Sequence, residues 1–326
     1  MSAPQRPMLL RSLLAAGCLL SLWSAPPLRA QPYFLTEGSG VVRQGDTLLI
    51  VDDGQPGAYF RLPLDGQTGP LIPLDPERLE RVPVPNANLA TDLEAIDVLA
   101  DGRVVILSER LRALFSVEGM VAEYASSFAE FGGRGLEGLA IRPLAEQSSQ
   151  VAVLSEGGYP DYGRVPAQLR QAVGRKPLRP VIQIHRLLPG DDAIRIEGTN
   201  LVELDVPLPA GRPPRAQRFR APDLVWHRGP DGKLGFIVLL TSLNSEGKRQ
   251  YLYHWLQRFA LDGSRLGEPL DLNQAAPPEL KGANWEGMGW FEEGESVVLV
   301  YESHPDPRAE AFVLELPAEW KQHRHP

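Results

Sequence analysis

The sequence predicts an all-β chain that folds as a single β-propeller. Glycine and proline number 31 each and interrupt the chain every few residues. No stretch keeps apolar residues at helical spacing over ten or more positions, so short strands joined by turns are favoured over helices. The third observation is an internal repeat, which is typical of propeller blades.

Each repeat consists of a short strand, a turn and a continuous apolar strand. The clearest copy runs from Asp92 to Val98, turns at Asp101-Gly102-Arg103 and continues as an apolar strand that ends in Ser108-Glu109. Two close copies and two looser ones occupy residues 135–141 with 151–156, 284–290 with 297–302, 37–42 with 48–53, and 221–226 with 236–241. The five visible repeats predict five blades or, if one repeat is too degenerate to see, six.

Further strands are expected on the outside of the blades. They fall at residues 58–62, 114–117, 181–187, 251–261 and 311–316. The third repeat also carries a Pro- and Arg-rich insertion from about 157 to 180. The last repeat lacks an outer strand, and we expect Tyr33-Phe34-Leu35 to supply it, so that an N-terminal strand closes the ring and leaves no exposed edge.

The first thirty residues have the layout of a secretory signal. Two arginines precede an apolar run from Leu13 to Trp23, small residues follow up to Ala30, and no acidic residue occurs. The run is shorter than the roughly 20 residues that cross a bilayer, so we expect no stable membrane insertion. We predict a signal peptide at 1–30, a propeller domain at 31–316, a polar tail at 317–326, and a periplasmic or secreted protein.

Cys18 leaves an alternative open, because Ala15-Ala16-Gly17 before it would suit lipid attachment. The apolar run continues past Cys18, which favours removal with the signal. The mature chain would then have no cysteine, which excludes disulfides, thiol catalysis and thiolate metal sites. Loss of three arginines would move the formal charge from −8 to −11, so nucleic acid is not an expected partner. We expect a monomer.

The repeat places acidic residues in pairs at one mouth of the channel. The first strand of a blade starts where the second strand ends, so the acids at these points should be neighbours: Glu94 with Glu109, Glu137 with Glu156, Glu286 with Glu302, and Glu37 with Asp52 or Asp53. So many carboxylates would repel one another without a cation. We predict Ca²⁺, a hard cation with oxygen ligands, held by Glu37, Glu94, Glu109, Glu137, Glu156, Asp223, Glu286 and Glu302.

Another interpretation treats each Glu-Gly as a turn with a solvated acid, its glycine required by backbone geometry. Three close copies, each followed by a second acid, favour a functional cluster. Zinc is disfavoured because the histidines are scattered.

Basic residues concentrate in the segments that should open on the same face. Guanidinium groups beside a carboxylate-held metal are typical of phosphate-ester sites. The predicted substrate-binding residues are Arg175, Lys176, Arg179, Arg218, Arg220, Lys248 and Arg249, and the best candidates for catalysis are Glu137 and Glu286. The competing interpretation is that these residues only make flexible loops soluble.

Three motifs share one pattern, in which a glutamate precedes a small residue and the following strand ends in Ser-Glu or Tyr-Glu: Leu93-Glu94-Ala95, Leu136-Glu137-Gly138 and Trp285-Glu286-Gly287. In these motifs the chain resembles the phytase-like propeller family, which is described as having the esterase-like activity of phytase. The resemblance implies a secreted propeller with calcium-dependent phosphoester hydrolysis, and Glu94, Glu137 and Glu286 as its motif acids.

Two further readings stay open. The first repeat, Glu37-Gly38 with Val51-Asp52, is similar to gluconolactonase and senescence-marker propellers, which hold one divalent ion and open lactones. In the fourth repeat Asp223-Leu224 replaces Glu-Gly, which puts a complete ring of ligands in doubt. The alternatives to a phosphoesterase are therefore a non-catalytic binding module for an anionic ligand or partner protein, and a metal-dependent lactonase or arylesterase.

Overall fold

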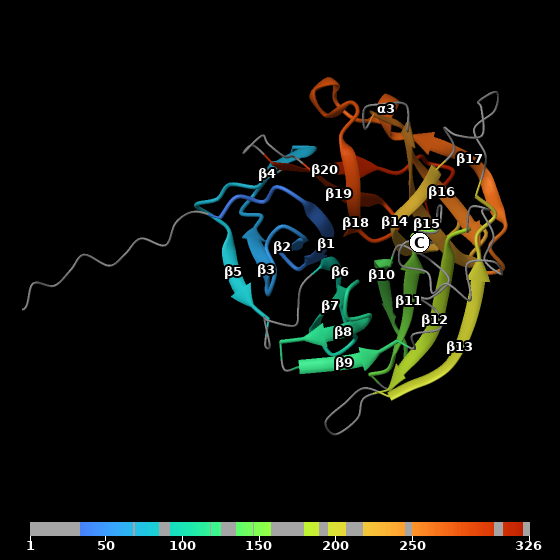
Figure 1. The fold of residues 1–326 in the computed structure, drawn as a ribbon. Coiled ribbons are helices and arrows are strands. Elements are labelled where there is room, and N and C mark those ends of the chain that lie inside the picture. Colours follow the sequence, from blue (N-terminus) through green and yellow to red (C-terminus); the bar gives the residue numbers. More distant parts are fainter. Residues whose placement is uncertain are drawn as a thin grey trace, which may run out of the picture. The chain divides into compact units, whose positions relative to one another are not determined.

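The computed structural model contains five four-stranded antiparallel sheets arranged around a centre (Figure 1). It describes residues 33–67, 69–84, 92–117, 119–124, 135–145, 147–157, 179–188, 195–206, 218–244, 250–302 and 309–321. The prediction of an all-β propeller is confirmed, and the choice between five and six blades is settled at five.

The blades follow one another along the chain. Blade 1 contains β1 (Gly38–Gln44), β2 (Thr47–Asp52), β3 (Ala58–Pro63) and β5 (Glu80–Pro83). Blade 2 contains β6 (Leu93–Val98), β7 (Val104–Ser108), β8 (Ala113–Ser116) and β9 (Gly119–Glu123). Blade 3 contains β10 (Leu136–Pro143), β11 (Ser149–Ser155), β12 (Val181–Leu188) and β13 (Arg195–Glu203). Blade 4 contains β14 (Arg218–Arg228), β15 (Leu234–Asn244), β16 (Gln250–Ala260) and β17 (Arg265–Asp271). Blade 5 contains β18 (Asn284–Glu292), β19 (Ser296–Glu302), β20 (Glu310–Glu315) and β4 (Leu71–Pro73). The short helices α3 (Leu272–Ala275) and Pro278–Leu280 join blades 4 and 5.

An N-terminal strand closes the ring, but it is β4 and not the segment Tyr33-Phe34-Leu35. After β3 the chain leaves blade 1, pairs with β20 of blade 5 through Ala311 opposite Ile72, and returns to form β5. Residues 33–35 form no strand. Leu35 is instead buried against blade 1, while Glu37 makes an isolated bridge with Glu302 of blade 5. Blades 1 and 5 are therefore connected by both the β4–β20 pairing and the Glu37–Glu302 bridge.

Close approach between inner strands explains the small residue of the Glu-Gly motif. A Cβ atom on Gly287 would lie 2.7 Å from the Cα of Gly40, and one on Gly40 would lie 2.7 Å from the Cα of Ala95. Neither glycine has a positive φ angle. The glycine is thus required by packing between blades and not, as the turn interpretation assumed, by backbone conformation.

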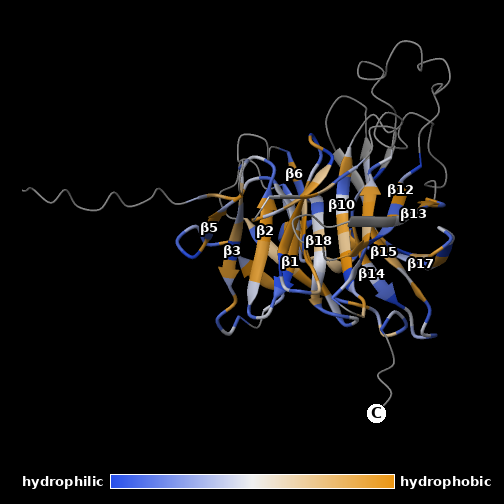
Figure 2. Ribbon diagram, turned by 90° about the horizontal axis from the view of Figure 1, so that it is seen from below, coloured by the Kyte–Doolittle hydropathy of each residue, from blue (hydrophilic) through white to orange (hydrophobic). Residues whose placement is uncertain are grey.

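The second strands are buried along most of their length, because neighbouring blades cover both of their faces. Figure 2 shows apolar residues along the strands and polar residues in the turns at their ends. Trp226 of blade 4 donates its indole N–H to the carbonyl of Ala140 in blade 3, at 3.0 Å, and Trp290 of blade 5 donates to the carbonyl of Trp226, also at 3.0 Å. These side chains wedge between blades.

The packed structure extends past residue 316, into the segment predicted to be a polar tail. The side chain of Trp320 is 3% exposed and packs with the core between blades 4 and 5, and the Arg258 guanidinium lies over its ring at 5.0 Å. Within the described part of the chain, no helix has the length and apolar character needed to span a bilayer.

Candidate metal centre at the carboxylate mouth

One end of the central channel is lined by equivalent positions of all five blades, and we call this end the carboxylate mouth. At the entry of each first strand the chain places Glu37, Asp92, Gly135, Arg220 and Asn284. The residues opposite them, at the end of each second strand, are Asp53, Glu109, Glu156, Thr241 and Glu302. Acids of blades 1 and 2 therefore occupy both positions, whereas blade 4 places a cation at the entry.

The motif glutamates lie two residues after the entry position, on β-bulges. In blade 2 Leu93 pairs with Ser108 and Ala95 with Leu107, so that Glu94 has no partner across the ladder. Glu137 and Glu286 occupy the same bulge in blades 3 and 5. A bulged residue is free of ladder pairing and re-aims its side chain. The repeated bulge is the local device that presents the motif acids to the mouth.

Three carboxylates from two blades converge at this mouth. Oxygen atoms of Asp53, Asp92 and Glu94 all lie within 4.8 Å of one another, and the three side chains are half-buried. Asp53 follows β2 of blade 1, while Asp92 and Glu94 come from the start of blade 2. Asp92 has a φ angle of 60°, a left-handed conformation that aspartate tolerates better than most residues. We call this group the Asp-Asp-Glu cluster.

Burial and mutual repulsion favour the protonated forms of this cluster. Desolvation raises the pKa of Asp53 to about 7, with the charge and hydrogen bond of Asp92 adding to the effect. Desolvation also raises the pKa of Glu94 well above its ordinary value, and the next largest contribution is the charge of Glu137 in blade 3. Acids of blades 1, 2, 3 and 5 all raise the pKa of Glu94, so the carboxylates of the mouth converge at this residue.

The Asp-Asp-Glu cluster fits a hard divalent cation. All its donors are carboxylate oxygens, and no basic side chain of the described residues contacts them within 4.0 Å. Calcium takes six to eight oxygen ligands, which three carboxylates can supply in part, with waters or carbonyls completing the shell. A cation here would remove the repulsion that raises the pKa of Asp53.

The opposite side of the mouth is organised by Arg220. Its Nε donates to Glu156 of blade 3, and its Nη1 and Nη2 donate to the two carboxylate oxygens of Glu286 in blade 5 at 3.4 and 3.3 Å. The side chain of Glu156 is fully buried, and that of Arg220 is 13% exposed. Arg220 thus compensates charge on the side of blades 3 to 5, away from the Asp-Asp-Glu cluster.

Asn284 connects the two acids of blade 5. Its side-chain amide donates to Glu286 and also to Glu302, the latter at 2.8 Å. Glu286 and Glu302 are therefore neighbours, as the repeat predicts; Asn284 donates to both of them, and Arg220 pairs with Glu286. Glu37 and Asp52 are also neighbours, since the Asp52 carboxylate accepts the backbone N–H of Glu37 at 3.1 Å.

Asp223, one of the predicted metal ligands, lies in a different setting from the motif glutamates. It stands at the position of the motif glycine, opposite Leu239, and is 1% exposed. Its carboxylate accepts backbone N–H groups of Met288 in blade 5 at 2.7 Å and of Leu139 in blade 3 at 3.4 Å. The other blades have only glycine or alanine at this position, where the inner strands come closest together, and we call this level of the channel the neck. The neck therefore has room for one larger side chain, and Asp223 links three blades there.

The predicted substrate-binding residues have different outcomes. Arg220 lies on β14 and is bonded to two glutamates instead of projecting from a loop. Arg179 pairs with Glu203 at 3.2 Å, on the outer strand of blade 3 and away from the inner ring. Only the backbone of Arg218 is described, and Arg175, Lys176, Lys248 and Arg249 lie outside the described residues.

Two residues of the cluster, Asp53 and Asp92, were not among the predicted ligands. Both belong to the repeat, and aligning the entry positions would have marked Asp92 as the equivalent of Glu37. Their approach across two blades has no signal in the sequence, because it depends on the angle between neighbouring sheets.

No protein-family model matches this chain. No curated protein matches it either. Among solved structures, the chain is similar to an endo-arabinase from Bacteroides thetaiotaomicron, with a TM-score of 0.51 and 10% identity over 89% of this chain and 96% of that one. At this identity the likeness shows the propeller fold alone.

Weaker similarity extends to other propellers. Virginiamycin B lyase from Staphylococcus aureus gives a TM-score of 0.37 at 10% identity, over 89% of either chain. A protein assigned as a gluconolactonase gives 0.38 at 13% identity, over 91% of this chain and 96% of that one. Neither TM-score carries a functional argument.

Proposed function

We propose that this protein is an exported, calcium-dependent hydrolase that cleaves phosphate esters at the carboxylate mouth. The observation that carries the proposal is the convergence of Asp53, Asp92 and Glu94. When bound there, the cation supplies a Lewis acid that polarises an oxygen of the substrate. The signal-like residues 1–30 support action outside the cytoplasm, and the family resemblance carried by the motif acids supports a phytase-like substrate range.

Arg220 suits the role of orienting the phosphoryl group. Its two contacts with Glu286 are at the long end of the hydrogen-bond range, so this pair can open at small cost. A phosphate oxygen can then accept from the guanidinium, which remains held in place by Glu156.

Release from Arg220 leaves Glu286 able to take a proton from an attacking water. The water oxygen forms a bond to phosphorus, the ester P–O bond breaks, and the leaving alkoxide takes up the proton that Glu286 accepted. Glu137 occupies the same bulge in blade 3 and is the second candidate for this role.

The test is hydrolysis of p-nitrophenyl phosphate by the protein from residue 31 onward, with calcium and with chelator. We expect turnover that requires calcium and is lost in Asp92→Asn and Glu94→Gln. Glu310→Gln, on an outer strand, is the matched control and should keep full activity. Turnover that survives chelator or both cluster variants would refute the site, and calcium binding without turnover would support the binding-module alternative.

Lactone opening with one ion is a second candidate, because the described residues form a single three-carboxylate group. Hydrolysis of δ-gluconolactone, measured beside the phosphoester, distinguishes the two. One bound calcium with lactone turnover alone would favour the lactonase, and phosphoester turnover favours the first proposal.

A further inference from the structure

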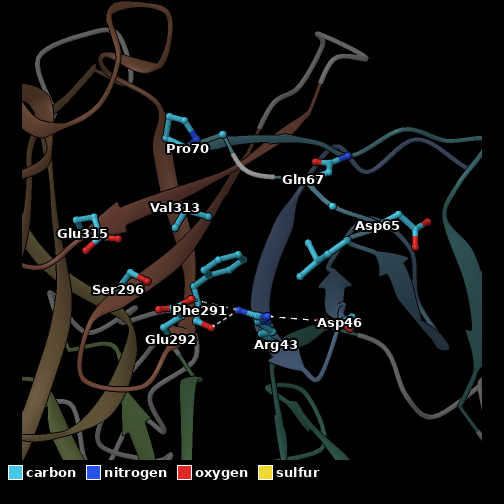
Figure 3. A pocket seen from close by; sticks show the side chains of 13 residues that line it. Arg43, Asp46, Asp65, Gln67, Pro70, Phe291, Glu292, Ser296, Val313 and Glu315 are labelled. Carbon is cyan, nitrogen blue, oxygen red and sulfur yellow. Dashed lines mark hydrogen bonds and ion pairs between the residues drawn. The ribbon is translucent and has the colours of Figure 1, made fainter. Parts of the chain in front are cut away.

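A cavity lies at the other end of the blades from the carboxylate mouth, on the seam between blades 1 and 5. Its volume is about 660 Å³, and its wall includes Arg43, Asp65, Gln67, Phe291, Ser296 and Glu315 (Figure 3). The β1–β2 and β18–β19 turns are near it, whereas the carboxylate mouth is at the opposite ends of these strands. Pockets of this size commonly hold small molecules.

The cavity exists because the chain crosses the seam to reach β4. The described parts of the crossing segment are residues 64–67 and 69–70. Residue Leu64 ties it to blade 1, because its N–H donates to the carbonyl of Asp46 at 2.8 Å. It is held to blade 5 by the N–H of Val313, which donates to the carbonyl of Pro70 at 2.7 Å. The segment forms one side of the cavity, and the two blades form the others (Figure 3).

Arg43 also spans this seam and has a fixed position. Its Nε donates to the carbonyl of Gly45 at 2.8 Å in blade 1, and its Nη1 donates to the carbonyl of Phe291 at 3.1 Å in blade 5. The guanidinium lies over the Phe291 ring at 4.6 Å. Arg43 is therefore held in place beside an aromatic side chain in the wall of the cavity.

The charges of this wall are compensated locally, in contrast to the Asp-Asp-Glu cluster. Arg43 lies 3.6 Å from Asp46 and 4.0 Å from Glu292. The remaining pairs are Asp65 with Arg78 at 3.4 Å and Glu315 with Lys321 at 2.8 Å. A charged ligand would meet both signs at short range, whereas a neutral ligand with several hydroxyl groups could donate to the carboxylates and accept from the guanidinium and the amide of Gln67.

We propose that this seam cavity binds a neutral saccharide, with Phe291 against the apolar face of a sugar ring and Gln67 and Arg43 bonded to its hydroxyls. A ligand that touches both blades binds the closed ring and not the opened one, so it should also raise the melting temperature. The site is independent of the carboxylate mouth and of the proposed hydrolase activity.

The test is titration of the protein from residue 31 onward with maltose, cellobiose, lactose and sucrose, and with glucuronate as the charged comparison. We expect at least one neutral disaccharide to bind and to raise the melting temperature. Gln67→Ala should weaken that binding about fivefold, the usual effect of losing one hydrogen bond. Gln274→Ala, the same substitution in helix α3 between blades 4 and 5, should leave the binding unchanged.

Phe291→Leu keeps an apolar side chain but removes the ring. It should weaken saccharide binding clearly and lower the melting temperature of the free protein only slightly. Glu94→Gln should have no effect on saccharide binding. Failure of all four disaccharides to bind, binding of glucuronate alone, or unchanged binding in both Gln67→Ala and Phe291→Leu would overturn the proposal.

Discussion

Carboxylate oxygens of Asp53 and Asp92 lie within 4.8 Å of each other, although the two residues belong to neighbouring blades of the propeller. Burial raises the pKa of Asp53 to about 7, and the nearby charge of Asp92 adds to this effect. The same oxygens lie within 4.8 Å of a Glu94 oxygen. A proton and a divalent cation therefore compete for the oxygens of this cluster. This competition should affect calcium affinity and thermal stability.

The first prediction concerns pH and calcium affinity. Above pH 7 Asp53 is ionised and available to a cation, and below pH 7 it holds a proton that the cation must displace. The Kd for calcium should therefore rise as the pH falls from 8 to 6, by up to about tenfold per unit. Calorimetric titrations at these pH values measure it. Equal affinity at pH 8 and pH 6 would contradict the role of Asp53, and Asp53→Asn should bind weakly with a flatter pH dependence.

A second prediction compares two motif glutamates that differ in their surroundings. Glu94→Gln removes a repelled charge, so it should raise the melting temperature in chelator and abolish the further rise caused by calcium. Glu286→Gln removes a charge that Arg220 and Asn284 stabilise, so it should lower the melting temperature and keep the calcium-dependent rise. Thermal unfolding of both variants, with and without millimolar calcium, tests this. Shifts of the same sign would show that the two sides of the mouth are not electrostatically distinct.

The third prediction concerns Arg220. Arg220→Met leaves the fully buried Glu156 carboxylate without this partner, and losing one member of a buried pair costs about 3–5 kcal/mol. Urea unfolding measures the loss. Adding Glu156→Gln to the same chain should recover part of it, because the buried charge is then gone. A double variant as unstable as Arg220→Met would mean that Glu156 is not the reason for the loss.

A fourth prediction separates structural from functional carboxylates. Asp223→Asn replaces one acceptor oxygen by a donor that faces a backbone N–H of Met288 or Leu139, which should cost about 1–3 kcal/mol. Calcium affinity should be unchanged, because Asp223 is buried at the neck. A loss of calcium binding at unchanged stability would restore Asp223 as a ligand.

The pattern of the chain determined the fold and one face of the site. Apolar second strands, bounded by turns and repeated five times, are enough to predict blades, since each strand must bury both faces against its neighbours. The same repeat predicts that Glu94, Glu137 and Glu286 occupy equivalent places, because equivalent residues of repeated units lie at equivalent points around the ring.

Only the tertiary structure decided how these places differ from one another. A repeat specifies position within a blade but neither the distance between blades nor the direction of a bulged side chain. These depend on packing at the neck, where Gly40 and Gly287 allow the inner strands to approach and Asp223 fills the remaining space. Contact across blades therefore separated Glu94, which lies with Asp53 and Asp92, from Glu156 and Glu286, which pair with Arg220, and no single blade contains this division.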